Sequence, residues 1–235
     1  MEDVLDKVRD ALKSNIDEHA LATGQKFSKE KLKYHGVRTA NVRKIGKTFF
    51  KMIDSRSKSE IYDLCEDLWR SGYLEESIIA CNWSQYLCDA YEPEDFSIFQ
   101  HWINEYITNW ASCDTFCNHT MGGFLERYPD YVEKLRDFAK SRNRWMRRAA
   151  AVSLIVPARK GKFLGDVLEI ATILLLDKDD LVQKGYGWML KVASQSHQKE
   201  VFDFVIKNKS VMPRTALRYA IEKMPKDLRT IAMAK

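Results

Sequence analysis

Two residues one helical turn apart could do chemistry together. Trp110 and Asp114 are four positions apart in the sequence, so on a helix they would lie on one face. An ionised carboxylate can stabilise a developing positive charge or orient a water molecule, and an indole face attracts cations. The pair therefore suits a reaction in which the substrate gains positive character.

Basic and aromatic residues follow at similar positions further along the chain. They are Arg147, Arg148, Lys184, Trp188 and Lys191. Lysine and arginine pair with phosphates, and indole faces pack against sugars or bases, so this mixture suits a nucleic acid. A carboxylate among such cations would repel phosphates, which indicates that it has a role of its own.

An alternative needs no chemistry at all. Asp114 could form only an ion pair with Arg148 of the next repeat, and tryptophans such as Trp110 and Trp188 often pack between helices. The residue types leave both interpretations open. The combination at matching repeat positions is what favours a functional site.

The elements that must position these residues are predicted to be helices. The chain has 235 residues, of which 45% are hydrophobic, with 10 glycines and 5 prolines, which favours an all-α fold over a many-stranded sheet. The apolar residues Val4, Val8, Leu12 and Ile16 step by four along one expected helix face.

Several helix starts can be predicted from capping residues. Ser57, followed three positions later by Glu60, fits a capping box. Further starts are expected at Asp95, at Pro129-Asp130 and at Ser210 to Pro213.

A weak internal repeat organises these helices. Segments starting at Leu74, Trp110, Trp145 and Leu181 align with one another, 35 or 36 residues apart. This period suits a pair of helices, and stacked pairs present their inner helices along one concave surface. We expect an all-α, HEAT-like solenoid of about six helix pairs, forming one domain over residues 1–235 with a concave basic groove.

Other classes of protein are disfavoured. The longest apolar stretch, near Val167 to Leu176, is too short to span a membrane, and the acidic start Met1-Glu2-Asp3-Val4 is unlike a secretory signal. The five cysteines show no C-x-x-C spacing, and Cys113, Cys117 and His119 would not point at one ion on a continuous helix. We expect a cytoplasmic protein with buried thiols and no metal.

Two further segments are interpreted locally. Gly122-Gly123 has neither a G-x-G-x-x-G pattern nor a phosphate-loop lysine, and is predicted to break the chain between helices. The basic stretch from Arg136 to Arg148 leads into the segment that holds Arg148, and is expected to bind phosphate.

The order and spacing of several motifs resemble the AlkD-type DNA alkylation repair glycosylases, a family of HEAT-like repeat proteins. The resemblance runs from about Phe27 to near Met224. Its landmarks are Tyr34-His35-Gly36-Val37-Arg38-Thr39 with Arg43 beyond, Trp110 through Asp114, Arg144-Trp145-Met146-Arg147-Arg148-Ala149-Ala150, Gln183-Lys184-Gly185-Tyr186-Gly187-Trp188, and Arg218-Tyr219-Ala220-Ile221.

The resemblance implies a base-excision repair enzyme that hydrolyses the N-glycosidic bond of positively charged N3- or N7-alkylated purines in double-stranded DNA. It does so without flipping the base, in contrast to most enzymes of base excision. Asp114 would be the catalytic carboxylate, Trp110 and Trp188 would flank the lesion nucleotide, and Arg148 would support the site. DNA contacts are expected from Phe27, Arg38, Arg43, Arg144, Arg147, Lys184, Lys191 and Arg218. No cofactor or metal is implied, and we expect a monomer.

The sequence departs from the family pattern at Ala111, at Phe27 and in the segment Cys113-Asp114-Thr115-Phe116-Cys117. Ala111 stands where the family usually has an acidic residue after the tryptophan, and Phe27 stands where an aromatic hydroxyl is expected. These departures bear on lesion choice and rate. The alternative function is a non-catalytic solenoid that binds DNA, RNA or protein.

Overall fold

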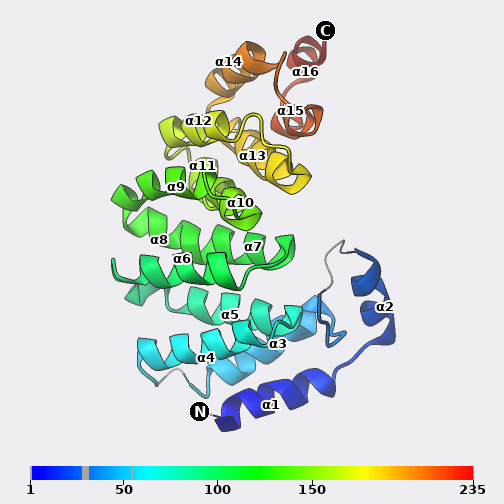
Figure 1. The fold of residues 1–235 in the computed structure, drawn as a ribbon, viewed down its shortest axis with the longest axis vertical. Helices are drawn as coiled ribbons and strands as arrows, with labels where there is room; N and C mark the ends of the chain where they lie inside the picture. Colours follow the sequence, from blue (N-terminus) through cyan, green and yellow to red (C-terminus); the bar gives the residue numbers. More distant parts are fainter. Residues whose placement is uncertain (1, 28–31, 54, 235) are drawn as a thin grey trace. The chain divides into compact units, whose positions relative to one another are not determined.

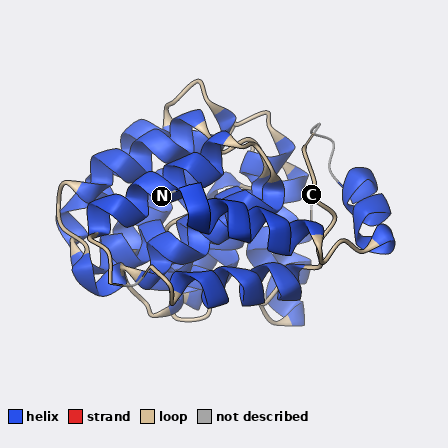
Figure 2. Ribbon diagram, turned by 90° about the horizontal axis from the view of Figure 1, so that it is seen from below, coloured by secondary structure: helices blue, strands red, loops and turns tan. Residues whose placement is uncertain are grey.

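The described residues form helices joined by loops. The computed structural model describes residues 2–27, 32–53 and 55–234, without the side chains of residues 2, 3 and 25–27. Within these ranges there are helices and loops, and no strand beyond the isolated bridges Ile16–Val37 and Lys33–Tyr73 (Figure 2). The all-α prediction is confirmed. In the same ranges, no helix has both the length and the apolar character needed to cross a bilayer.

The helices group into two compact units, Met1–Phe116 and Cys117–Lys235 (Figure 1). The first unit holds α1 (Glu2–Lys13), α2 (Glu18–Phe27), α3 (Thr39–Phe50), α4 (Lys58–Arg70), α5 (Leu74–Tyr86), the 3₁₀-helix η1 (Cys88–Ala90), α6 (Asp95–Glu105) and α7 (Trp110–Phe116). In this unit α5 packs against α3, α4 and α7, and α1 packs against α3.

The second unit begins with the π-helical turn η2 (Cys117–Met121). It continues with α8 (Gly122–Arg127), the 3₁₀-helix η3 (Pro129–Lys134), α9 (Leu135–Ala139), α10 (Arg144–Val152), α11 (Ile155–Arg159), α12 (Leu164–Ile173), α13 (Asp180–Ala193), α14 (Gln198–Asn208), α15 (Arg214–Ile221) and α16 (Lys226–Met233). Helix α13 packs against both α10 and α15, and so lies between them in this unit.

The predicted register matches the observed helix starts. Helices α5, α7, α10 and α13 begin at Leu74, Trp110, Arg144 and Asp180, within one residue of the four aligned segments. The number of repeats, the concave groove and the single domain remain predictions.

An aromatic cluster forms much of the core of the first unit. The ring of Phe116, at the end of α7, lies 5.6 Å from Phe99 and 5.9 Å from both Trp69 and Trp102. Edge-on aromatic pairs of this kind contribute about 0.5–1.5 kcal/mol each beyond the area they bury. Phe116 therefore anchors one face of α7 in the core.

The capping predictions have mixed outcomes. The capping box at Ser57 and Glu60 is confirmed, with each side chain bonded to the backbone of the other residue, and α6 begins at Asp95 as predicted. Pro129 and Asp130 open a 3₁₀-helix, and α15 begins directly after Pro213.

The prediction that Ile16 continues the first helix face is wrong. Helix α1 ends at Lys13, and Ile16 is 51% exposed. The Ser14 hydroxyl and the Asn15 amide donate to backbone carbonyls four residues back, at distances of 2.8 and 2.9 Å. Local bonds of this kind compete with helix propagation, and apolar periodicity does not reveal them.

The predicted break at Gly122-Gly123 is also wrong, because both residues open α8 directly after η2. A Cβ atom at Gly122 would lie 3.1 Å from the carbonyl oxygen of Ser153 and 3.2 Å from that of Cys117. Glycine at this position permits close approach of another backbone rather than a turn.

Gly187, next to Trp188 on α13, offers a test of this close packing. A Cβ atom there would lie 2.7 Å from the Tyr219 Cβ and 2.8 Å from the Ala216 carbonyl oxygen, both on α15. We expect Gly187→Ala to lower the free energy of unfolding by about 1–3 kcal/mol, because neither atom can move without shifting the backbone. Urea denaturation measures the change.

Gly123→Ala is the matched control, because its Cβ would meet nothing within 4 Å. This variant should be as stable as the wild type, or more stable by up to about 1 kcal/mol. Equal stability of the two alanine variants would show that the α13–α15 packing does not depend on Gly187.

Candidate functional site

Helix α7 carries Trp110 and Asp114 away from its buried face. Its buried residues are Ser112, Cys113 and Phe116. Trp110 is 39% exposed, and Asp114 is half-buried. The first turn is fixed by the buried Asn109, whose side-chain oxygen accepts a 2.9 Å hydrogen bond from the backbone N–H of Ser112.

The other helices of the register carry different residues at the positions of Trp110 and Asp114. Helix α5 has Leu74 and Ile78, α10 has the buried Trp145 and Ala149, and α13 has Leu181 and Gly185. Of these four helices, α7 alone combines an exposed indole with a carboxylate at these two positions. The pair thus departs from a repeat whose other members are apolar.

Arg148 is held inside the second unit. It is only 5% exposed, and its guanidinium donates to the backbone carbonyl of Leu181 on α13. A Cβ at Gly185 would lie 3.4 Å from the Arg148 Cγ, so the glycine leaves room for the arginine side chain. A buried guanidinium keeps its charge, and here the α10–α13 packing fixes its position.

Arg147 is bound by its own unit. Its Nε donates to Asp177 at 2.6 Å, and its Nη1 donates to the carbonyls of Ser141 and Arg142 at 3.0 Å. Because the Asp177 side chain is only 8% exposed, this pair is shielded from water. A contact of Arg147 with DNA, as the sequence predicts, would require its guanidinium to leave these partners.

The basic stretch expected to bind phosphate begins with a paired residue. Arg136 donates to Glu169 through two bonds of 2.6 Å and to Asp166 at 3.2 Å. This guanidinium joins α9 to α12. Its pKa is raised, chiefly by the bonds to Glu169.

Arg144 and Lys184 also form partly exposed ion pairs. Arg144 lies 3.0 Å from Asp179 and stacks over the Trp145 ring, and Lys184 lies 2.6 Å from Asp180 one turn before it on α13. Exposed pairs contribute only about 0–1 kcal/mol, so a phosphate could replace the carboxylate partner at little cost.

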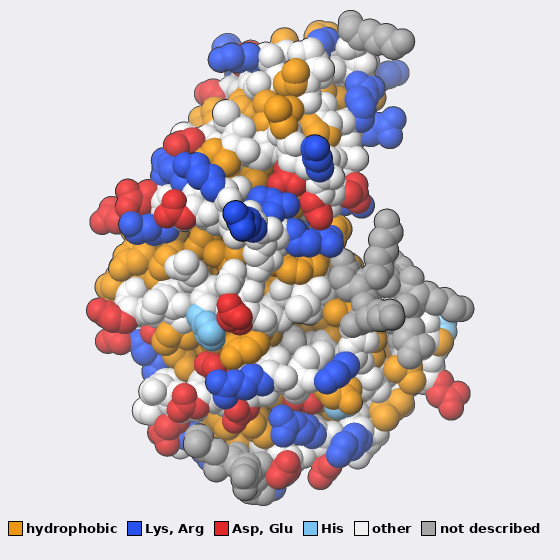
Figure 3. Space-filling model, viewed as in Figure 1, with side chains coloured by type: hydrophobic (Ala, Val, Ile, Leu, Met, Phe, Trp, Pro, Cys, Tyr) orange, Lys and Arg blue, Asp and Glu red, His pale blue; other side chains and the backbone are white. Residues whose placement is uncertain are grey.

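Lys191 and Trp188 lie further along α13. The Lys191 ammonium is 3.0 Å from Glu222 and 5.4 Å from the centre of the Tyr219 ring, while Trp188 is half-buried. Acidic and basic side chains are interleaved on the visible faces of both units, as such pairing requires (Figure 3).

The remaining predicted DNA contacts lie at both ends of the chain. Arg38 is 65% exposed and pairs with Asp17 at 2.7 Å, whereas Arg43 on α3 and Arg218 on α15 are exposed. The side chain of Phe27 lies outside the described residues.

Two buried glutamates that sequence reasoning missed hold the segment from Tyr34 to Thr39. Glu75 accepts backbone hydrogen bonds from His35, Gly36 and Val37, at 3.0, 2.8 and 3.1 Å. Its neighbour Glu76 bonds to the His35 ring at 2.8 Å. The signal was present in the sequence, because two adjacent acids open α5 where the aligned helices have none.

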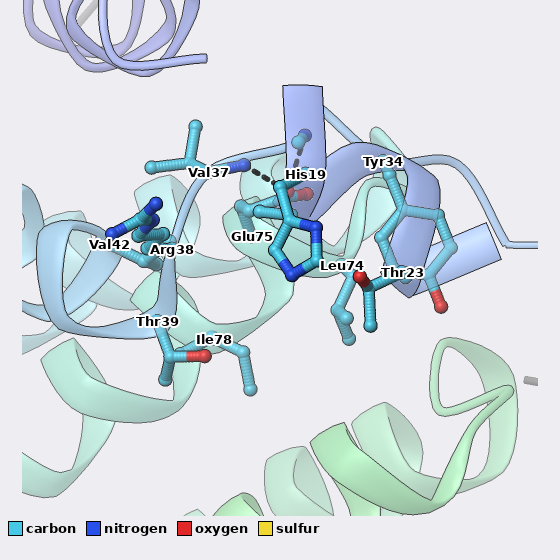
Figure 4. Close-up of a pocket in the computed structure, with 13 residues that line it drawn as sticks. His19, Thr23, Tyr34, Val37, Arg38, Thr39, Val42, Leu74, Glu75 and Ile78 are labelled. Carbon is cyan, nitrogen blue, oxygen red and sulfur yellow. Dashed lines mark hydrogen bonds between the residues drawn. The ribbon is translucent and has the colours of Figure 1, made fainter. Parts of the chain in front are cut away.

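A cavity of about 340 Å³ lies beside this segment (Figure 4). It is bounded by α2, α3, the start of α5 and the segment clamped by Glu75. Its lining residues are His19, Ala20, Thr23, Gly24, Tyr34, Gly36, Val37, Arg38, Thr39, Val42, Leu74, Glu75 and Ile78. Leu74 and Ile78 occupy the register positions that Trp110 and Asp114 occupy in α7.

The thiols have no evident part in the site. Cys65, Cys81, Cys113 and Cys117 are buried, and Cys88 is exposed. Burial raises the pKa of the Cys81 thiol well above its usual value, which disfavours the reactive thiolate.

These features define, over the residues that the structure describes, an all-α protein with an exposed indole and a carboxylate on one short helix. Its fold is similar to that of a predicted DNA alkylation repair enzyme from Enterococcus faecalis, with a TM-score of 0.81 at 15% identity. The match covers 90% of this chain and 98% of that protein.

The sequence places the chain within a particular family. A model of the DNA alkylation repair enzyme family matches residues 8–224, and the protein belongs to this family. No curated protein matches the chain. The resemblance inferred from the motifs is therefore confirmed at the level of the family.

Glu76 should make stability depend on pH. Burial raises the pKa of this carboxyl, but the bonds from His35 and Arg9 outweigh burial and hold the pKa below its ordinary value. A lowered folded-state pKa means that the stabilisation is present above the unfolded pKa and is lost as pH falls through the folded value. Urea denaturation in steps from about pH 7 to pH 3 should show this loss.

Glu76→Gln should flatten the acid limb of that profile and lower stability near neutral pH by about 1–3 kcal/mol, because a buried ionic bond is removed. Glu94→Gln, at an exposed position, serves as the control and should keep the wild-type profile. An unchanged acid limb in Glu76→Gln would rule out this carboxyl as its source.

Proposed function

We propose that the protein is a DNA glycosylase that removes positively charged N3- or N7-alkylated purines from duplex DNA in base-excision repair. Membership of the DNA alkylation repair enzyme family supports the substrate class. The observation that carries the proposal is the exposed Trp110 indole one turn from the half-buried Asp114 carboxylate on α7.

The proposed hydrolysis requires a carboxylate and a water molecule. Alkylation at N3 or N7 gives the purine a positive charge, so it leaves readily with the electrons of its glycosidic bond. The sugar then develops oxocarbenium character, which an ionised Asp114 stabilises electrostatically. Water adds to the sugar carbon and loses a proton, and the products are a neutral base and an abasic sugar.

The tryptophans position the sugar in this proposal. Trp110 presents its indole beside Asp114, so a deoxyribose packed on it would be held close to the carboxylate. By family resemblance, Trp188 contacts the same nucleotide and the buried Arg148 supports the site. Two half-buried cations of the second unit, Arg144 and Lys184, would bind flanking phosphates by exchanging their carboxylate partners.

The alanine at position 111 makes Asp114 the sole acid on α7. Where the family usually has a second acidic residue, this helix offers none. The proposed stabilisation of the sugar cation by α7 therefore depends on one carboxylate.

The decisive measurement is release of 7-methylguanine or 3-methyladenine from methylated duplex DNA. Wild-type protein should release the base faster than spontaneous loss, and Asp114→Asn should lower the rate by about 10²-fold or more, because the amide cannot stabilise the sugar cation. DNA affinity should change little, since the substitution preserves shape.

Asp63→Asn is the matched control, since Asp63 is an exposed aspartate on α4 of the same unit. It should retain wild-type release. A wild-type protein that binds the duplex but releases no base above the spontaneous rate would instead establish the alternative, a non-catalytic DNA-binding repeat protein.

A further inference from the structure

The cavity of the first unit plays no part in the proposed reaction. It is lined by residues of α5 whose positions in the repeat correspond to those of Trp110 and Asp114 on α7. Leu74 and Ile78 line it from α5, at the positions equivalent to Trp110 and Asp114. Helix α5 packs directly against α7 within this unit. The helix next to α7 therefore lines a cavity with Leu74 and Ile78, and a ligand bound on the exposed face of α7 would lie close to this helix.

The lining combines an apolar interior with a polar rim. Val42, Leu74 and Ile78 supply aliphatic surface, and the Tyr34 ring forms a side wall (Figure 4). Thr23 and His19 supply hydrogen-bonding groups at the opening. Such a lining suits a flat, largely apolar ring system with polar edges, and about 340 Å³ falls within the range of small-ligand sites.

The charges at the cavity favour an anionic ligand group at its edge. Glu75 already accepts three backbone hydrogen bonds, and so has little capacity left to bind a ligand cation. Arg38 is 65% exposed, and its ion pair with Asp17 lies at the surface. Exposed pairs exchange at low cost, so the guanidinium can pass from this carboxylate to a phosphate.

We propose that this cavity binds an unpaired nucleotide of DNA, other than the lesion, with its base inside and its phosphate on Arg38. The proposal rests on the DNA substrate of the proposed function, but not on catalysis. Only an unstacked base can enter a cavity, because a paired base is covered on both faces by its neighbours. The site would make the protein favour DNA in which stacking is already interrupted.

The test uses unmethylated DNA with one bulged 2-aminopurine, a fluorescent base, beside the same base in a fully paired duplex. Wild-type protein should bind the bulged duplex about five-fold more tightly or better, and change its fluorescence. Thr23→Trp places an indole in the opening and should abolish both effects. Ala22→Trp, an exposed neighbour on α2 outside the lining, should retain them.

Arg38→Gln should weaken binding of the bulged duplex and reduce the salt dependence of binding by about one phosphate contact. Equal affinity of the wild type for bulged and paired DNA would overturn the proposal, as would a preference that survives in Thr23→Trp. Free 2-aminopurine deoxyribonucleoside monophosphate should bind far more weakly than the bulged duplex. Equally tight binding of the two would make this a mononucleotide site and overturn the assignment to DNA.

The readout is independent of base release. A protein that showed the bulge preference but released no methylated base would fail the proposed reaction and keep this site. A protein that released the methylated base without any bulge preference would support the proposed reaction and overturn the nucleotide site.

Discussion

Burial of one face of each short helix is the constraint on which the candidate site depends. Helix α7 is seven residues long, and the contacts of Phe116 with Trp69, Phe99 and Trp102 fix its rotation. Since residues four apart share a face, fixing the buried side also fixes what remains at the surface. The indole of Trp110 is exposed because the aromatic core holds the opposite side of the helix.

In the second unit, close approach of helix backbones fixes the position of α13 in a similar way. Gly185 leaves space for the Arg148 side chain, and Gly187 allows α13 to approach α15. Trp188 directly follows Gly187 and lies three positions after Gly185, so its helix is positioned by contacts that a larger residue would prevent. In both units a candidate residue therefore lies on a helix that close packing holds in place.

The sequence predicted what depends on local order. The capping box at Ser57 could be predicted because its two residues are three positions apart, and the helix starts of the register could be predicted because the repeat recurs in the sequence itself. The clamp by Glu75 could not, since it joins backbone groups almost 40 residues away. Arg147 illustrates the same limit, because its binding to Asp177, a partner 30 residues away, shows only in the folded chain. Periodicity predicts which face is buried, but not what a polar side chain meets.

The cations proposed to act at the site fall into two groups, according to their burial and their bonding partners. Arg144 and Lys184 have carboxylate partners near the surface, where water and salt weaken the pairs. Their binding to DNA would be an exchange of one anion for another, sensitive to salt and carrying little sequence information. Arg148 differs, since its guanidinium is buried and donates to a backbone carbonyl of α13, so the fold itself fixes its position. A buried charge is costly unless the fold supplies partners for it, so the position of Arg148 depends on the packing of α10 against α13 in a way that those of Arg144 and Lys184 do not.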